Sequence, residues 1–427
     1  MKKFLALALA LVMTASLAAC GGSSSAPAAS SGSASGSAAA SGSAAAAADY
    51  QVAMITDYGD ITDQSFNQTT YEACKAFCED NGVSFNYFKP AGDNTADRVA
   101  MIEKAVDEGY NVIVMPGYAF GGAIVEAAPE FPDVKFIALD VAKGDLLEAG
   151  VNAAGEQYDY NPDNWDLNKY VDMSNVYCAV YQEELCGYMA GYAAVKLGYK
   201  NLGFLGGMAV PAVVRYGYGF VQGVDAAAAD MGLTDVSLKY VYGGQFYGDA
   251  DITAAMDTWY AGGTEAVFAC GGGIYTSAVD AAKKVDGKVI GVDTDQAGVI
   301  AAYAAGEGAD AATVDSFKSL TITSAMKGLY PTTYDTLTDV IVNGNWDKYV
   351  GQIATLGLVS GDDPEANYVQ IPMESTQWAD GAFTQDDYKA MVKDMFDGKL
   401  TVSNDISKSP EDFATVITVD AQGQLKG

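Results

Sequence analysis

From residue 49 onward, short apolar runs alternate with stretches whose apolar positions recur at helical spacing. VAMITD (52–57), NVIVMPG (111–117) and VKFIALD (134–140) have the length and β-rich composition of buried strands. Between such runs lie amphipathic segments such as SFNQTTYEACKAFCEDNG (65–82), which are typical of helices. Alternating strands and helices predict an α/β protein with parallel sheets and right-handed crossovers.

The alternation occurs in two series, separated by a polar and aromatic insertion at 144–173. The second series contains apolar runs such as NLGFLGG (201–207), EAVFACGG (265–272) and KVIGVDTD (288–295). The length of the chain after residue 48 is sufficient for two domains. The two series therefore predict two lobes.

The first twenty residues have a different pattern, MKKFLALALALVMTASLAAC, with Lys2 and Lys3 followed by an apolar core at 4–13. This layout is typical of a secretory signal peptide, and its apolar core is too short to span a bilayer. The segment LAAC ending at Cys20 resembles a bacterial lipobox. That resemblance implies cleavage before Cys20, its acylation, as with palmitate, and anchoring at the outer face of the cell membrane. The alternative is an ordinary signal peptide with a chance cysteine.

Residues 21–48 consist almost entirely of Gly, Ser and Ala. Such a segment cannot bury enough apolar surface to fold, so we interpret it as a disordered tether. A flexible chain of that length spans roughly 30 Å between its ends. The predicted tether would hold the folded part away from the membrane surface.

Composition excludes several classes of function. The chain has 24 Lys plus Arg against 55 Asp plus Glu, a net charge of -31, which repels phosphate backbones, so no nucleic acid partner is expected. It has no His, which removes Ser-His-Asp and Cys-His nucleophiles and every His-based metal site. Neither a Walker A motif nor a complete G-x-G-x-x-G follows the first strand. We expect no enzyme activity, no cofactor and no metal. Besides Cys20, five cysteines are expected mainly as small buried side chains.

Loops that follow predicted strands are the expected place for a ligand, because open parallel sheets bind ligands beyond the carboxyl ends of their strands. These loops mix polar, Gly and aromatic residues. For each Asp in them a helix N-cap is the alternative role, above all for Asp63. The loops lie at 57–67, 116–120, 140, 206–216, 270–274 and 293–296.

Several segments carry a resemblance to a known family in their order along the chain. The segments resemble those of the basic membrane lipoprotein family, the substrate-binding lipoproteins of ABC importers, and in particular its purine nucleoside receptor branch. Their most specific features are the D-x-S-F-N loop and the G-G-M-x-x-P segment. The segments are ITDYGDITDQSFNQ (55–68), NLGFLGGMAVPAVVRYGYGFVQGVDAA (201–227), EAVFACGGG (265–273), VIGVDTDQ (289–296) and ITSAMKG (322–328).

The resemblance implies the type I periplasmic-binding-protein fold, in which two Rossmann-like lobes with parallel sheets are joined by three hinge crossings. By analogy the crossings are placed near Ser174, Leu320 and Tyr349. The first lobe would then comprise 49–173 and 321–348, and the second 174–320 and 349–427.

The resemblance also implies two rings that hold a flat purine base between the lobes. Phe66 matches one such position, and Tyr216 stands where the family usually has Phe. Ordinary core packing is the alternative for both rings. Independently of the resemblance, Gly272 lies where a glycine lets backbone N–H groups approach a ligand at the start of a helix.

Polar residues in the same loops are suited to the ribose and to the edge of the base of a nucleoside. Asp293 is the strongest candidate to accept hydrogen bonds from ribose hydroxyls, and Lys327 matches a family position that reaches the sugar. Asp57, Asn67 and Asp140 are candidates for the base edge or the sugar. An Asn side chain offers a donor and an acceptor together, as the mixed edge of a purine requires.

These assignments predict a solute-binding lipoprotein that delivers a purine nucleoside to the permease subunits of an ABC importer. The insertion at 144–173 and the stretch at 297–320 are longer than expected for the family and could line the cleft. A different ligand on the same fold, riboflavin or a sugar, is therefore the alternative.

Overall fold

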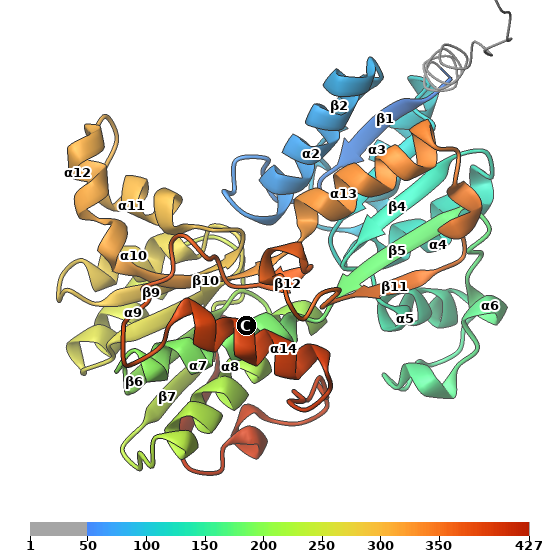
Figure 1. Ribbon diagram of the computed structural model, residues 1–427. Helices are drawn as coiled ribbons and strands as arrows, with labels where there is room; N and C mark the ends of the chain where they lie inside the picture. Colours follow the sequence, from blue (N-terminus) through green and yellow to red (C-terminus); the bar gives the residue numbers. More distant parts are fainter. Residues whose placement is uncertain (1–48, 427) are drawn as a thin grey trace, which may run out of the picture. The chain divides into compact units, whose positions relative to one another are not determined.

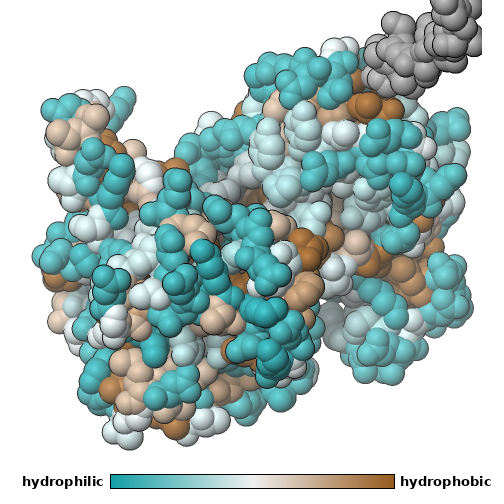
Figure 2. All heavy atoms as spheres, in the orientation of Figure 1, coloured by the Kyte–Doolittle hydropathy of each residue, from teal (hydrophilic) through white to brown (hydrophobic). Residues whose placement is uncertain are grey.

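The computed structural model describes residues 49–426, shown in Figure 1 with colours that follow the sequence. The predicted signal peptide, Cys20 and the predicted tether all lie outside this range. Hydrophilic residues cover most of the face shown in Figure 2, in keeping with the acidic composition. Within 49–426, no helix combines the length and apolar character needed to cross a bilayer.

Sheet A has six strands, all parallel. In spatial order they are β11 (Ile353–Leu356), β5 (Val176–Tyr181), β4 (Lys135–Leu139), β3 (Val112–Pro116), β1 (Gln51–Ile55) and β2 (Ser84–Phe88). Its main helices are α2 (Phe66–Asn81), α3 (Thr95–Asp107), α4 (Phe120–Glu130), α5 (Lys143–Ala153) and α13 (Leu329–Leu337).

Both faces of the inner strands of sheet A are covered, which explains why these four strands are apolar almost throughout. In β1, Val52 and Met54 belong to the core cluster that includes Phe77 of α2. The intervening Ala53 and Ile55 belong to a second cluster with side chains of α3, α4 and α5. Successive side chains of a strand point to opposite faces, so a strand covered on both sides needs a continuous apolar run.

Sheet B has seven strands, and only β12 runs antiparallel. In spatial order they are β12 (Val369–Gln370), β10 (Thr321–Lys327), β9 (Lys288–Asp293), β8 (Ala266–Cys270), β6 (Asn201–Gly206), β7 (Ser237–Tyr242) and β13 (Thr418–Gln424). Its helices are α7 (Glu183–Lys196), α8 (Pro211–Asp230), α9 (Ala250–Ala261), α10 (Tyr275–Ala282), α11 (Ala297–Ala305), α12 (Ala311–Ser316) and α14 (Gln385–Phe396).

The predicted lobe boundaries assign three strands to the wrong sheet. β5 and β11 pair with each other in sheet A, and β10 pairs with β9 in sheet B. The chain therefore changes sheet after β5, after β10 and after β11, one element later than the predicted crossings near Ser174, Leu320 and Tyr349. A strand at a crossover is equally apolar in either sheet, so its sequence does not reveal which neighbour it pairs with.

The insertion at 144–173 is not wholly irregular. Most of its first part is helix α5, and the remainder forms a short 3-10 turn (Pro162–Asn164) and helix α6 (Leu167–Tyr170). Tyr158, Trp165 and Tyr170 pack together beside α5. The insertion thus has a small aromatic core of its own. The five cysteines of the described range are buried, as expected, and all five are free.

Helices α7 and α8 pack with almost no side chain between them. A Cβ atom on Gly187 would lie 2.2 Å from the Tyr216 carbonyl oxygen, and one on Gly219 would lie 2.0 Å from the Glu184 carbonyl oxygen. Real Cβ atoms do not approach backbone atoms so closely, so these positions require glycine. This close packing fixes the first turns of both helices, which carry Glu183 and Tyr216 of the polar network described below.

We expect Gly219→Ala to lower the free energy of unfolding by at least about 3 kcal/mol, because the new methyl group overlaps backbone that cannot move aside. Urea unfolding measures the change. Gly298→Ala is the matched control, since Gly298 lies in helix α11 with no atom within 4 Å of an added Cβ. The control should leave stability unchanged or raise it by up to about 1 kcal/mol. Equal effects of the two variants would contradict the close approach of α7 and α8.

Candidate functional site

The carboxyl ends of strands from both sheets surround one cavity of about 380 Å³. This is where the predicted loops converge, as expected for parallel sheets. All eight residues predicted as ligand contacts line the cavity: Asp57, Phe66, Asn67, Asp140, Tyr216, Gly272, Asp293 and Lys327. Their roles in ligand binding stay predictions, but the structure brings them together.

Two carboxylates, one from each sheet, occupy strained backbone positions at this end. Asp140 follows β4 with φ 61°, and Asp293 ends β9 with φ 64°. A non-glycine residue in the left-handed region costs about 1 to 3 kcal/mol and persists only where the surroundings enforce it. The strain turns both side chains toward the end of β10, where Lys327 lies.

Lys327 is the buried cation at the centre of the site. Its ammonium group forms an ion pair with Asp140 and lies 3.5 Å from Glu183 Oε1 and 3.7 Å from Asp293 Oδ1. Burial alone would lower the pKa of Lys327, but the three carboxylates outweigh burial and raise it. Burial raises the pKa of Asp140 to about 6, although Lys327 opposes the shift. The lysine is therefore charged at neutral pH.

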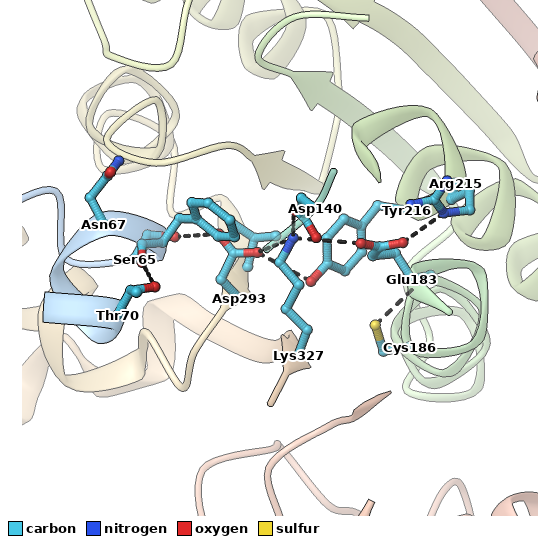
Figure 3. A network of polar contacts seen from close by, with 12 residues as sticks. Ser65, Asn67, Thr70, Asp140, Glu183, Cys186, Arg215, Tyr216, Asp293 and Lys327 are labelled. Atoms are coloured by element: carbon cyan, nitrogen blue, oxygen red, sulfur yellow. Dashed lines mark hydrogen bonds and ion pairs between the residues drawn. The ribbon is translucent and has the colours of Figure 1, made fainter. Parts of the chain in front are cut away.

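Figure 3 shows that this network extends beyond Lys327 in both directions. On one side Arg215 of α8 donates through Nε to Glu183 Oε2 at 2.7 Å. On the other side Asp293 accepts hydrogen bonds from Ser65 Oγ at 2.6 Å and from the Tyr216 hydroxyl at 3.2 Å. Ser65 belongs to the loop after β1, so Asp293 joins that loop to sheet B directly.

Sequence reasoning missed Glu183 and Arg215. Glu183 is fully buried, and Arg215 retains 14% side-chain exposure. For Glu183 the signal was present, because it follows the apolar strand β5 after Gln182 and so stands at the carboxyl end of a sheet A strand. The predicted boundaries placed that strand at a lobe crossing, so its carboxyl end was not among the predicted ligand loops.

The loop between β1 and α2 is organised by Asp63. Its two carboxylate oxygens accept backbone hydrogen bonds from Ser65, Asn67 and Gln68 at 2.9 to 3.0 Å. Asp63 therefore satisfies the first N–H groups of α2, which is the helix-capping alternative considered for it. This arrangement holds Phe66 and Asn67 at the cavity wall.

The aromatic lining differs in part from the prediction. Phe66 is half-buried, and the Lys327 ammonium lies 4.6 Å from its ring centre. Tyr216 has only 1% exposure, and its hydroxyl is held by Asp293. Phe246, in the loop after β7, also lines the cavity and was not predicted. Apolar lining from Phe66 and Phe246 thus comes from loops of different sheets.

Phe246 rests on backbone that only glycine permits. A Cβ atom on Gly207 or Gly271 would lie 2.2 Å or 2.7 Å from the Phe246 ring, and one on Gly272 would lie 2.9 Å from the Phe246 carbonyl oxygen. Gly272 has φ 46°. Gly272 is therefore needed first to accommodate the loop that carries Phe246. This structural role stands beside the ligand contact that was predicted for Gly272 from its place at the start of a helix.

Some buried acceptors around the cavity have no protein partner. Asn67 Oδ1 and Asp140 Oδ1 accept no hydrogen bond from any described residue. A buried polar atom without a partner costs about 1 to 3 kcal/mol, and a bound molecule with donor groups would recover that cost. The site is therefore suited to a ligand that carries several N–H or O–H donors.

Comparison with known proteins finds one family across most of the described chain. The family model described as "ABC transporter substrate-binding protein PnrA-like" matches residues 50–362. The chain is similar to the ABC transporter nucleoside-binding protein BmpA of Lactococcus lactis, with 25% identity over 261 residues, 58% of this chain and 65% of that protein. It is also similar to a CD4+ T-cell-stimulating antigen of Listeria monocytogenes, with 27% identity over 310 residues, 69% and 74% of the two chains.

Solved structures agree with this result at the level of the fold. An ABC transporter solute-binding protein from Aeropyrum pernix K1 matches with a TM-score of 0.58 and 20% identity, covering 85% of this chain and 90% of that one. A solute-binding protein from Conexibacter woesei matches with a TM-score of 0.56 and 21% identity, covering 83% and 99%. These likenesses confirm the predicted α/β fold of type I solute-binding proteins.

We expect Lys327→Met to lower the free energy of unfolding by about 3 to 5 kcal/mol, because three buried carboxylates lose their shared cation. Without the lysine, burial raises the pKa of Asp140 still further above that of an Asp in the unfolded protein. The folded state binds protons more tightly, so the loss should shrink as the pH falls from about 8 toward about 6.

Urea unfolding across that pH range measures both effects. Lys284→Met is the control, because Lys284 pairs with Asp257 on the exposed surface and its loss should change stability little at any pH. A Lys327→Met variant with unchanged stability, or with a deficit that grows on acidification, would contradict the central role of the lysine.

Proposed function

Because the chain belongs to the family of PnrA-like ABC transporter substrate-binding proteins, we propose that it captures a purine nucleoside in the cavity between its sheets. One observation carries the proposal: a single cavity combines two aromatic side chains from loops of different sheets with buried acceptors that have no protein partner. A purine nucleoside has a flat apolar base and several N–H and O–H donors. The name of the Lactococcus relative, a nucleoside-binding protein, agrees with this choice.

The base would lie against Phe66 and Phe246. Phe66 comes from the start of α2 beside sheet A, and Phe246 comes from the loop after β7 of sheet B. Base stacking on an aromatic side chain contributes about 1 to 3 kcal/mol per contact. Tyr216 was the ring predicted for the second lobe, but its burial and its bond to Asp293 leave it better suited to hold that carboxylate in place.

The sugar would lie beside the charged residues of the cavity. Asp140 presents a buried oxygen without a partner, and Lys327 and Asp293 are adjacent to it. An ionised carboxylate accepts strong hydrogen bonds from hydroxyl groups, as a ribose requires. The charged lining contains five Asp and two Lys, so a phosphorylated ligand would be repelled.

A ligand held by residues of both lobes favours the closed arrangement of the lobes, since it contacts all of its partners only there. The closed form would then be recognised by membrane permease subunits of the ABC importer. The family places this protein among substrate-binding components, which present small molecules to such permeases. The hinge crossings would be the three places where the chain changes sheet.

The protein would act at the outer face of the cell membrane, anchored through acylated Cys20. Relatives such as an uncharacterized lipoprotein of Pyrococcus abyssi, 25% identical over 311 residues, support a lipid anchor. Acyl chains contribute about 0.8 kcal/mol per buried CH₂ group, so two chains hold a protein at a bilayer stably. The segment 21–48 would separate the anchor from the folded part.

Thermal unfolding with a panel of compounds tests the function. Guanosine, inosine or adenosine should raise the midpoint by several degrees at about 100 times its dissociation constant, where binding stabilises by about 2.7 kcal/mol. Guanosine 5′-monophosphate should have a much smaller effect, because the acidic lining repels its phosphate. A shift with riboflavin, ribose or galactose but with no nucleoside would contradict the proposal and leave the family intact.

Phe66→Ala and Phe246→Ala should each weaken nucleoside binding by about 5- to 150-fold, as loss of one stacking contact predicts. Phe→Leu at either position should lose less, because an apolar side chain still covers the base. Isothermal titration calorimetry measures the affinities. Tyr160→Ala is the control, since Tyr160 is 76% exposed in the insertion and does not line the cavity. Unchanged affinity in both Ala variants would contradict a base held between these rings.

A further inference from the structure

The segment at 403–426 reaches the loop that carries Phe246. Its strand β13 runs parallel to β7 at the edge of sheet B, and just beyond β13 the Leu425 backbone N–H donates to the Tyr242 carbonyl oxygen at 2.8 Å. Tyr242 is the last residue of β7, and the loop at 243–249 follows it. Parallel strands bring their carboxyl ends to the same edge of a sheet. The residues after β13 therefore lie beside the loop that carries Phe246.

Helix α8 holds the segment at 403–426 in place before it reaches that loop. The Gln222 side-chain amide exchanges two hydrogen bonds with the backbone of Ser403, at 2.8 and 3.0 Å. Asp225 is only 7% exposed, and its carboxylate accepts the backbone N–H and the hydroxyl of Thr415 at 2.7 and 2.6 Å. This segment lies beyond the residues that the family model matches. Its path is therefore fixed by contacts of this chain's own.

Lys426 joins the two ends of the Phe246 loop. Its ammonium group forms an ion pair with Asp249 and donates to Gln245 Oε1 at 3.4 Å. The Gln245 side chain in turn donates to Asp249 Oδ2 at 2.9 Å. A Cβ atom on Gly244 would lie 2.9 Å from the Lys426 carbonyl oxygen, so the backbones are also close. Phe246 thus lies in a loop whose flanking residues are bridged by one lysine.

The two carboxylate oxygens of Asp249 have separate partners. Oδ1 accepts the Asp251 and Ile252 backbone N–H groups at 3.0 Å each and so caps helix α9. Oδ2 accepts from Gln245 and pairs with Lys426. The pair is partly exposed, with 30% of the lysine and 27% of the aspartate side chain accessible. Loss of the lysine should therefore leave the helix cap in place and release mainly the loop.

Phe246 itself is held from the backbone of the neighbouring strand ends. The Gly273 N–H donates to the Phe246 carbonyl oxygen at 2.8 Å, and the Phe246 ring packs against Gly207 and Gly271. These contacts fix the carbonyl group and the ring, while Lys426 fixes the residues on either side. A group that is already ordered in the free protein costs no conformational entropy when a ligand binds to it.

We propose that Lys426 is a positioning residue for ligand binding, an inference that rests on the proposed role of Phe246 in the cavity wall. Lys426 is not among the residues that line the cavity, so it acts through the loop at 243–249 and does not touch the ligand. It holds this loop in the conformation that presents the Phe246 ring. Without Lys426, a ligand would have to order the loop as it binds and would bind more weakly.

Calorimetric titration of the full chain with guanosine, inosine and adenosine tests the effect on affinity. We expect Lys426→Met to weaken binding by about 2- to 10-fold, because the ligand must then order the loop. Lys426→Arg should bind within about twofold of the unaltered protein, because a guanidinium group also pairs with a carboxylate. Lys200→Met is the matched control. It removes the same charge from an exposed pair with Asp235, just before β6 and outside the cavity lining.

A double variant tests whether the lysine acts through the ring. In a Phe246→Ala protein, Lys426→Met should cause no further loss of affinity, because the side chain that the loop positions is already gone. An equal loss with and without the Phe246 ring would overturn this route of action. Unchanged affinity of the Lys426→Met protein for a nucleoside that binds the unaltered protein would overturn the positioning role itself.

Hydrogen exchange without ligand separates this proposal from the nucleoside function. The backbone amides at 243–249 should exchange faster in Lys426→Met than in the unaltered protein, whereas Lys200→Met should leave them unchanged. Unchanged exchange in Lys426→Met would overturn the proposal, whichever ligand the cavity binds. Binding of none of the three nucleosides would overturn the nucleoside function, and the exchange rates then decide whether Lys426 restrains the loop.

Discussion

The buried ammonium group of Lys327 is the interaction on which the rest of the site depends. It joins Asp140 at the end of a sheet A strand to Asp293 at the end of a sheet B strand, and it also lies near Glu183. A buried ion is tolerated only when its charge is balanced and its hydrogen bonds are made. The charged side chains are held in place by the strained backbone at both Asp residues and by the close packing of α7 against α8.

The same network explains how a neutral but polar molecule can be held in an acidic protein. The lysine neutralises part of the charge of its carboxylates, so they remain available as acceptors without filling the cavity with uncompensated charge. The aromatic lining from Phe66 and Phe246 supplies the apolar part of the cavity. Recognition is divided between an apolar region for a flat ring system and acceptor atoms for its donors, which is the usual composition of a small-molecule site.

The candidate site was predictable to a large extent because strand ends are visible in the sequence. Asp57, Asp140 and Asp293 each follow an apolar run, and parallel strands bring such positions to one edge of each sheet. Arg215 and Phe246 were harder to find. Arg215 lies inside α8 and belongs to the polar network only through its hydrogen bond to Glu183. Phe246 follows strand β7, but its loop was not among the predicted ligand loops.

The sequence by itself determined the secondary structure, the parallel α/β architecture and the strand ends that carry the site, because these depend on local periodicity and on the geometry of parallel strands. Only the tertiary structure decided that β5 and β11 join sheet A while β10 joins sheet B, since apolar strands at a crossover are equally compatible with either sheet. It also decided that the Asn67 side-chain amide donates to Asp63. That contact depends on how the loop after β1 folds, which the order of residues does not specify.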